Sequence, residues 1–150
     1  MKLLSIYLDA CCINRPFDNQ RDGRVRLESE SFLILLEEIE KGNLHWLSSV
    51  VLDFEIEQIP DRIKQKKTKN YLLSVNKKIS VNLEIKNRAV ELQSLGFKTF
   101  DALHISCAEY GKSDVFLTTD DKLLKLAIKS QETLKVKVFN ITSWTQEYLK

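Results

Sequence analysis

Apolar residues along this chain recur with two different periods, and segments of the two kinds alternate. Short apolar runs, for example at residues 3–8 and 115–119, are typical of strands buried on both faces of a parallel sheet. Longer segments such as residues 25–41 carry apolar side chains every three or four positions and charged side chains between them, which is typical of an amphipathic helix. The pattern therefore predicts an α/β fold.

The expected elements follow from these two periods. Strands are expected at residues 3–8, 44–47, 79–81, 115–119 and 136–141, and helices at residues 25–41, 50–59, 83–95, 99–110, 120–130 and 143–149. Asn, Pro, Asp and Gly predict a loop through residues 11–23. Residues 61–70 are dense in lysine and predict an exposed helical turn or a mobile connection, after which Tyr71, Leu72, Leu73 and Val75 are expected to return to the core. Strands separated by helices of this length imply a parallel sheet with helices on both faces.

The composition indicates one ordered domain. The chain has 150 residues, of which 43% are hydrophobic, with only four Gly and two Pro, and this predicts a single globular domain over residues 1–150. No apolar run is long enough to cross a membrane, and the first strand begins too early to leave room for a signal peptide, so a cytosolic protein is expected. Cys11, Cys12 and Cys107 lack the spacings that hold zinc and are expected to be free thiols.

The charge changes this picture because it is unevenly distributed. The net charge is only +2, yet residues 61–88 hold nine Lys or Arg against two acidic residues, which leaves a net charge of −5 on the rest of the chain. Such asymmetry indicates an anionic partner on one side. The candidate contacts to nucleic-acid phosphates lie within residues 62–69 and are Lys64, Lys66, Lys67 and Lys69. A solvated face that only aids solubility is the alternative.

Four acidic residues occur where strands end or where helices turn toward the core. Asp9 directly follows the first strand and Asp120 follows the strand at residues 115–119, while Glu55 and Asp101 lie on predicted helices. A carboxylate at the end of a buried strand is costly unless it faces a cleft or a cation. Because the strand ends of an open parallel sheet converge on one crevice, the four acids predict a site for a divalent metal.

Helical geometry separates Glu55 from the other acids of its helix, since successive residues turn by about 100°. Glu55 falls on the apolar side, whereas Asp53 and Glu57 lie together on the opposite side. Glu55 is therefore the inward acid, unless this short helix packs differently and leaves it in solvent.

The helix at residues 99–110 is apolar around most of its circumference. Its apolar stripe consists of Phe100, Leu103, Cys107 and Tyr110, and only Ser106 and Glu109 are expected to be clearly exposed. Asp101 lies inside the apolar arc, about 40° from Ile105. An Asp of the first turn that complements the helix dipole is the alternative. His104, one turn later, is interpreted as a packed or hydrogen-bonded residue rather than as a ligand.

The segment at residues 118–121 combines two hydroxyls with two acids. Asp120 is favoured over Asp121 as the acid that faces the crevice because it is closer to the strand, but the pattern does not fix the choice. A plain helix N-cap is the alternative for Asp120. Thr118 and Thr119 can offer hydroxyls to a bound phosphate or water, although threonines at strand ends are common without such a role.

Taken in order, these residues resemble the PIN domain, the fold of the VapC toxins of toxin-antitoxin pairs. The matching stretches are residues 7–11, residues 49–55 with the inward Glu at their end, residues 100–105 and residues 116–120. The resemblance implies a three-layer α/β/α sandwich with a central, mainly parallel sheet. It also implies a ribonuclease in which Asp9, Glu55, Asp101 and Asp120 surround one or two Mg²⁺ or Mn²⁺ ions, a homodimer and, for a toxin, an antitoxin partner protein. The chain departs from the family at Cys11, where Ser, Thr or Asn is common.

The implied chemistry needs no protein nucleophile. Oxygen ligands without His or Cys select Mg²⁺ or Mn²⁺ over zinc, and the metal would activate a water for in-line attack on an RNA phosphodiester. Arg15 lies just beyond the first matching stretch, where it would meet a substrate phosphate or pair with an acid, and both interpretations stay open.

Two other functions are compatible with an acid at the end of the first strand. A phosphotransferase or a haloacid-dehalogenase-like hydrolase would use Asp9 as a nucleophile, but such enzymes carry a second Asp two residues later, where this chain has Cys11. The alternative from another class is a PIN-like module that binds RNA or a protein without cutting. Incubation with labelled RNA, with Mn²⁺ and with chelator, would distinguish that module from an enzyme.

Overall fold

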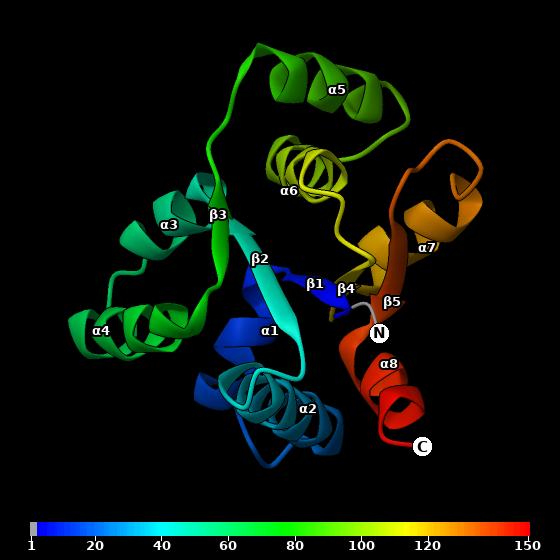
Figure 1. Ribbon diagram of the computed structural model, residues 1–150. Helices are drawn as coiled ribbons and strands as arrows, with labels where there is room; N and C mark the ends of the chain where they lie inside the picture. Colours follow the sequence, from blue (N-terminus) through cyan, green and yellow to red (C-terminus); the bar gives the residue numbers. More distant parts are fainter. Residues whose placement is uncertain (1–2) are drawn as a thin grey trace.

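The computed structural model describes residues 3–150, in which five strands form one parallel sheet in the order β3-β2-β1-β4-β5 (Figure 1). The strands are β1 (Ser5–Leu8), β2 (His45–Ser49), β3 (Lys77–Ile79), β4 (Val115–Thr118) and β5 (Lys137–Asn140). The α-helices are α1 (Ala10–Asn14), α2 (Gly23–Glu40), α3 (Val50–Glu57), α4 (Arg62–Tyr71), α5 (Leu83–Ser94), α6 (Thr99–Tyr110), α7 (Asp121–Lys129) and α8 (Ile141–Tyr148). Two 3₁₀ turns lie at Arg15–Phe17 and Leu72–Ser74.

Strand β1 is central because its side chains alternate between two cores. Ile6 and Leu8 pack with residues of α1, α2 and α8 on one face, whereas Tyr7 packs with residues of α5, α6 and α7 on the other. Tyr7 is paired in register with Leu47 of β2 and with Phe116 of β4. Helices therefore cover both faces of the sheet (Figure 1), as expected for an α/β/α sandwich, and the sheet is parallel throughout. The predicted fold class is confirmed.

Two segments are more helical than expected. The predicted loop at residues 11–23 is wrong in its first half, because the side chain of Asp9 caps α1 and the turn Arg15–Phe17 follows, with Pro16 at its start. Proline fits the first turn of a helix, where its missing N–H costs nothing. Residues 62–71 form a complete helix rather than a single turn or a mobile connection, because the Asp61 side chain accepts hydrogen bonds from Ile63 N and Lys64 N.

Strand β3 begins two residues before the expected position. Lys77 and Lys78 pair with β2 although both are exposed. An edge strand needs no apolar alternation, and lysine on an edge discourages pairing with another chain. The apolar run at residues 79–81 marks only the end of this strand.

Several burial expectations are wrong. Leu73 is 81% exposed, and Phe100 and Tyr110 are 41% and 46% exposed. Ser106 and Glu109 are instead covered by α5: Ser106 Oγ donates a hydrogen bond to Ile85 O at 2.7 Å, and Glu109 is paired with an arginine of that helix. Helix α6 therefore turns the side that carries Ser106 and Glu109 toward α5, which periodicity alone did not indicate.

Within residues 3–150, no helix is both long and apolar enough to span a bilayer. Cys11, Cys12 and Cys107 are free thiols, as predicted.

Candidate active site

Asp9 lies at the carboxyl end of β1 and is only 7% exposed. One carboxylate oxygen accepts a hydrogen bond from Ala10 N at 2.9 Å and so caps α1, and the other accepts one from Thr118 Oγ1 at 2.9 Å. Burial raises the pKa of Asp9, while His104 and Thr118 act in the opposite direction. The two strand ends of β1 and β4 are thus joined at this carboxylate.

Cys11 lies two residues after Asp9, where Ser, Thr or Asn is common in the PIN domain that the sequence resembles. Its Sγ donates to Asp9 Oδ2 at 3.4 Å and accepts from Thr119 N at 3.3 Å. A thiol can therefore make the contacts of a serine at this position, with weaker hydrogen bonds. The departure from the family at Cys11 therefore does not remove the hydrogen bond that this position donates to Asp9.

Asp101 lies in the first turn of α6 and is partly exposed. Burial and then the nearby charges of Asp9, Asp120 and Glu55 raise the pKa of Asp101 to about 6, although His104 acts in the opposite direction. Like charges disfavour ionisation of their neighbour. Asp101 is therefore under the electrostatic influence of the other three acids, which a cap residue in solvent would not be.

Asp120 is the N-cap of α7, where one carboxylate oxygen accepts hydrogen bonds from Lys122 N and Leu123 N. Asp121 turns the other way: its carboxylate is 69% exposed and binds Arg24 through two hydrogen bonds of 2.6 and 2.7 Å. The Arg24 guanidinium lowers the pKa of Asp121. This geometry favours Asp120 as the fourth acid, and the capping role predicted as the alternative is present as well.

Glu55 is connected to a buried hydrogen-bond chain. Its carboxylate contacts Nε2 of His104, whose Nδ1 lies 2.6 Å from the hydroxyl of Tyr7, and that hydroxyl lies 2.7 Å from Ser49 Oγ. The side chain of His104 is 1% exposed and that of Glu55 is 29% exposed. The sequence indicated a hydrogen-bonded His104 but not its partner. Tyr7 is the residue that could have indicated this chain, because a hydroxyl inside a buried strand needs a hydrogen-bond partner.

The four acids fit a divalent cation in chemistry, though not in their present arrangement. Among residues 3–150, no three His, Cys, Asp or Glu side chains are grouped closely enough to hold a metal ion. Asp9 and Asp120 each use one oxygen as a helix cap, and Glu55 is held by His104. Each acid offers hard oxygen ligands, and their mutual repulsion is what a bound cation relieves.

Comparison with known proteins identifies the family. The family model described as PIN domain matches residues 6–129. The chain belongs to the PIN domain family. Its fold is also similar to a chain of the crystal structure of VapBC2 from Rickettsia felis bound to a DNA fragment from their promoter. The TM-score is 0.59 with 13% sequence identity, over 91% of this chain and 98% of that one. No curated protein matches the sequence.

The remaining candidate residues of this PIN domain are mostly engaged by the protein itself. Arg15 is paired with an acid, as one of its two interpretations predicted: its Nε donates to Glu28 at 2.9 Å and its Nη1 to Asp18 at 2.9 Å. Thr118 is fully buried, and its hydroxyl donates to Asp9 and accepts from Asp120 N at 3.0 Å. Thr119 is 5% exposed. In this conformation the Thr118 hydroxyl supports Asp9, whereas the Arg15 guanidinium is held by Glu28 and Asp18, away from the four acids.

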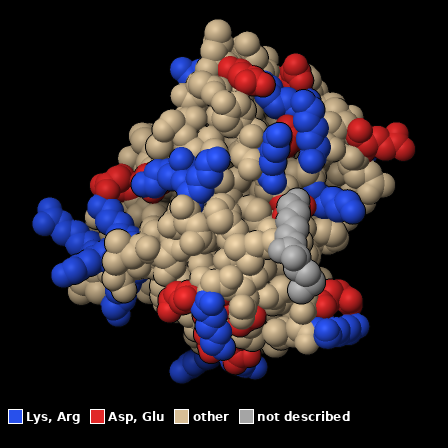
Figure 2. All heavy atoms as spheres, in the orientation of Figure 1, with Lys and Arg blue, Asp and Glu red and all other residues tan. Residues whose placement is uncertain are grey.

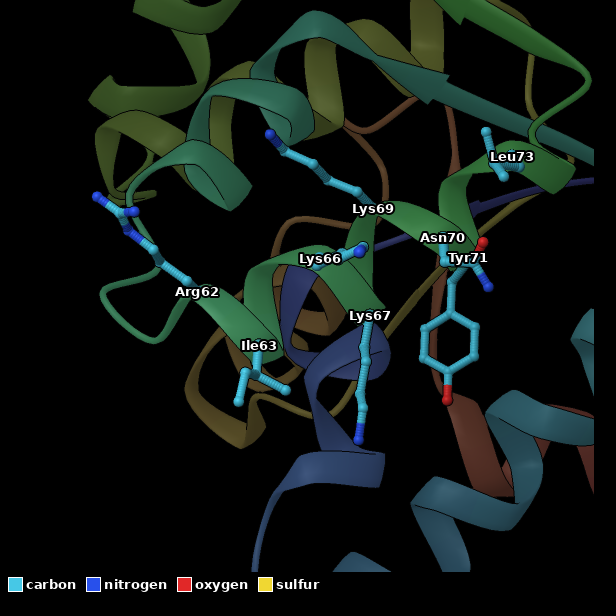
Figure 3. Close-up of a pocket in the computed structure, with 8 residues that line it drawn as sticks. All are labelled: Arg62, Ile63, Lys66, Lys67, Lys69, Asn70, Tyr71 and Leu73. Carbon is cyan, nitrogen blue, oxygen red and sulfur yellow. The ribbon is translucent and has the colours of Figure 1, made fainter.

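The lysines of α4 form a basic surface of this PIN domain. Figure 2 shows Lys and Arg side chains gathered over α4, on the left of that view. A cavity of about 850 Å³ lies along the helix and contains none of the four acids. Lys66 and Lys67 line it, whereas Lys64 is half-buried. Lys69 reaches toward α3, where it pairs with Glu57 (Figure 3), so part of the local charge excess is neutralised.

Proposed function

We propose that this PIN domain is a Mg²⁺- or Mn²⁺-dependent endoribonuclease whose site consists of Asp9, Glu55, Asp101 and Asp120. The observation that carries the proposal is the placement of Asp9 and Asp120 at the ends of the paired strands β1 and β4, where the Thr118 hydroxyl donates to Asp9 and accepts from Asp120 N. The pKa of Asp101, raised to about 6 by burial and then by the charges of the other three acids, supports it. A cluster of partly buried carboxylates destabilises a fold unless a cation neutralises it. Such a cluster is poorly suited to a structural role and well suited to binding a cation.

The chain's own residues orient these carboxylates. Thr118 and Cys11 hydrogen-bond to one oxygen of Asp9, and His104 holds Glu55 from the buried side. A bound Mg²⁺ or Mn²⁺ would neutralise the cluster and activate a water for attack on a phosphodiester. Lys64, Lys66 and Lys67 of α4 would bind more distant phosphates of the RNA. Arg15 would join them only after release from Glu28.

A cleavage assay tests this function. Purified protein is incubated with a labelled single-stranded RNA, with Mn²⁺ or with chelator. The wild type is expected to cut the RNA only with Mn²⁺, and Asp101→Asn is expected to abolish cutting. Glu57→Gln, an exposed acid of the same helix as Glu55, is the matched control and should keep activity. Cleavage by Asp101→Asn at the wild-type rate would refute the proposal. Binding without any cleavage would support the non-catalytic RNA-binding module instead.

We further propose that the enzyme is the toxin of a toxin-antitoxin pair, acts in the cytosol as a homodimer and is inhibited by an antitoxin protein. The similarity of its fold to a chain of the VapBC2 crystal structure supports the antitoxin partner, and the homodimer is what the resemblance to the PIN domain implies. Co-expression with the product of a small neighbouring reading frame tests the partner. A stable complex that no longer cuts RNA is the expected result, and two independent, non-interacting products would contradict it.

A further inference from the structure

Two exposed phenylalanines directly precede two of the acids along the chain. Phe54 precedes Glu55 on α3, and Phe100 precedes Asp101 on α6. Their side chains are 54% and 41% exposed. Although the two helices come from distant segments of the chain, the rings lie stacked, with centroids 5.9 Å apart and an interplanar angle of 28°. The pair therefore joins two helices that each carry one of the four acids.

The arrangement differs from the scattered apolar residues found on every protein surface. A single exposed aromatic residue needs no explanation. Here two rings lie in contact and nearly parallel, and Val50, one turn before Phe54 on α3 and 37% exposed, lies on the same side of the helix. The result is an apolar surface at the edge of an acidic cluster, where solvation of charge would favour polar neighbours.

We propose that Phe54 and Phe100 form a stacking platform for an unpaired base of the RNA, next to the phosphodiester that is cut. The inference rests on the proposed ribonuclease function and names the form of RNA that it accepts. Each ring is attached to the residue before an acid, so a base on the platform belongs to a nucleotide close to the reacting phosphate. Aromatic side chains hold single-stranded RNA in this way, because every base has a flat face. Bases inside a duplex are already stacked and are not available to the rings.

The helix that packs against α3 offers positive charge to an RNA occupant. Helix α4 lies against α3, where Gln65 Nε2 donates a hydrogen bond to Glu57 O at 3.0 Å. The exposed Lys66 and Lys67 of that helix can bind phosphates of the strand whose base lies on the rings.

RNA binding in the presence of chelator tests the platform separately from cleavage. The affinity of a short, fluorescein-labelled single-stranded RNA of mixed sequence is measured for the wild type and for the double variant Phe54→Ala and Phe100→Ala. We expect affinity to fall about tenfold or more, which corresponds to about 1.4 kcal/mol of stacking free energy. The slope of log affinity against log salt should not change, because stacking releases no counterions. A duplex of the same length should bind equally to both proteins.

Matched variants separate stacking from general apolar contact. Tyr110→Ala removes an exposed aromatic residue at the far end of α6 and should bind RNA like the wild type. Phe54→Trp and Phe100→Trp should keep the affinity, whereas replacement of both by Leu should lower it. Unchanged affinity of the Ala or Leu double variants overturns the platform. A change in oligomeric mass by light scattering, with RNA affinity intact, assigns the rings to a contact between copies and also overturns it. Failure of the wild type to bind RNA both in chelator and with Mn²⁺ would instead refute the proposed function.

Discussion

Tyr7 shows how one buried hydroxyl connects the core to the acid cluster. Its hydroxyl lies within hydrogen-bond distance of both Ser49 Oγ and His104 Nδ1. Tyr7→Phe removes the hydrogen-bond partner that these two buried groups share, so we expect a loss of about 1–3 kcal/mol in the free energy of unfolding. Urea unfolding measures it. Tyr110→Phe removes an exposed hydroxyl and should change stability little, and an equal loss in both variants would contradict a role for the buried chain.

Asp101 gives the metal-free protein a characteristic dependence of stability on pH. Its pKa is about 6 in the folded protein against an ordinary value of 3.8, so the folded state binds more protons than the unfolded state between these values. Stability should therefore fall as the pH rises from about 4 to about 6, and Asp101→Asn should remove that fall. Urea unfolding in chelator at several pH values measures it. Since a structural cap would give a loss of about 1 kcal/mol in the Asn variant at neutral pH, that result would contradict the account.

Individual residues differ in how far the sequence predicts them. Asp9, Asp101 and Asp120 could be proposed as site residues because each follows or enters an element whose apolar pattern is clear, and their role as ligands stays a prediction. The hydrogen-bond partner of Glu55 could not be predicted, since the contacts of His104 with Glu55 and Tyr7 depend on how α6, α3 and β1 meet in space. Spacing along a chain indicates the face of a helix but not the atom opposite it.

Helix α2 fixes the segment that carries Asp120. Arg24 donates two hydrogen bonds to Asp121, one to Thr119 O at 2.9 Å and one to the buried Glu28 at 3.2 Å. Arg24→Lys cannot reproduce this forked geometry. We expect a lower melting temperature and a higher Mn²⁺ requirement for cleavage. Arg26→Gln on the same helix is the control, and it should have neither effect. A fall in stability alone would limit Arg24 to a structural role.

Helix α4 should contribute electrostatic affinity for RNA. If Lys64, Lys66 and Lys67 bind phosphates, their replacement by Gln should make the slope of log affinity against log salt shallower by about 0.7 for each phosphate that is no longer neutralised. Lys125→Gln and Lys129→Gln on α7, which remove two positive charges instead of three, provide the control. A titration of RNA binding at several salt concentrations measures the slope, and an unchanged slope would remove α4 from the RNA-binding surface.

At the scale of elements, the long periodic segments were predictable and the short ones were not. The helix predicted at residues 25–41 is present as α2, Gly23–Glu40. Helix α1 is only five residues long and depends on the cap by Asp9, a residue that the pattern assigned to chemistry alone. Helix α4 has few apolar residues, so its periodicity was too weak to indicate a full helix.

At the scale of the whole molecule, alternation of strands and helices predicted a parallel sheet but not the order of its strands. The order places β4 beside β1, and Thr118 and Asp9 are therefore hydrogen-bonded although the chain between them includes β2, β3 and most of the helices. That Asp9 and Asp120 come to the same edge of the sheet was predictable only as a general property of strand ends. The distances of the four acids from one another depend on packing of α3 and α6, which only the structure provides.

Thermal unfolding with and without Mn²⁺ tests the four-acid metal site most directly. A ligand that binds only the native state raises the melting temperature. We predict that Mn²⁺ raises the melting temperature of the wild type and of Glu57→Gln relative to chelator, and that Asp101→Asn loses most of this rise. A wild-type melting temperature that ignores Mn²⁺, or an equal rise in Asp101→Asn, would contradict the site.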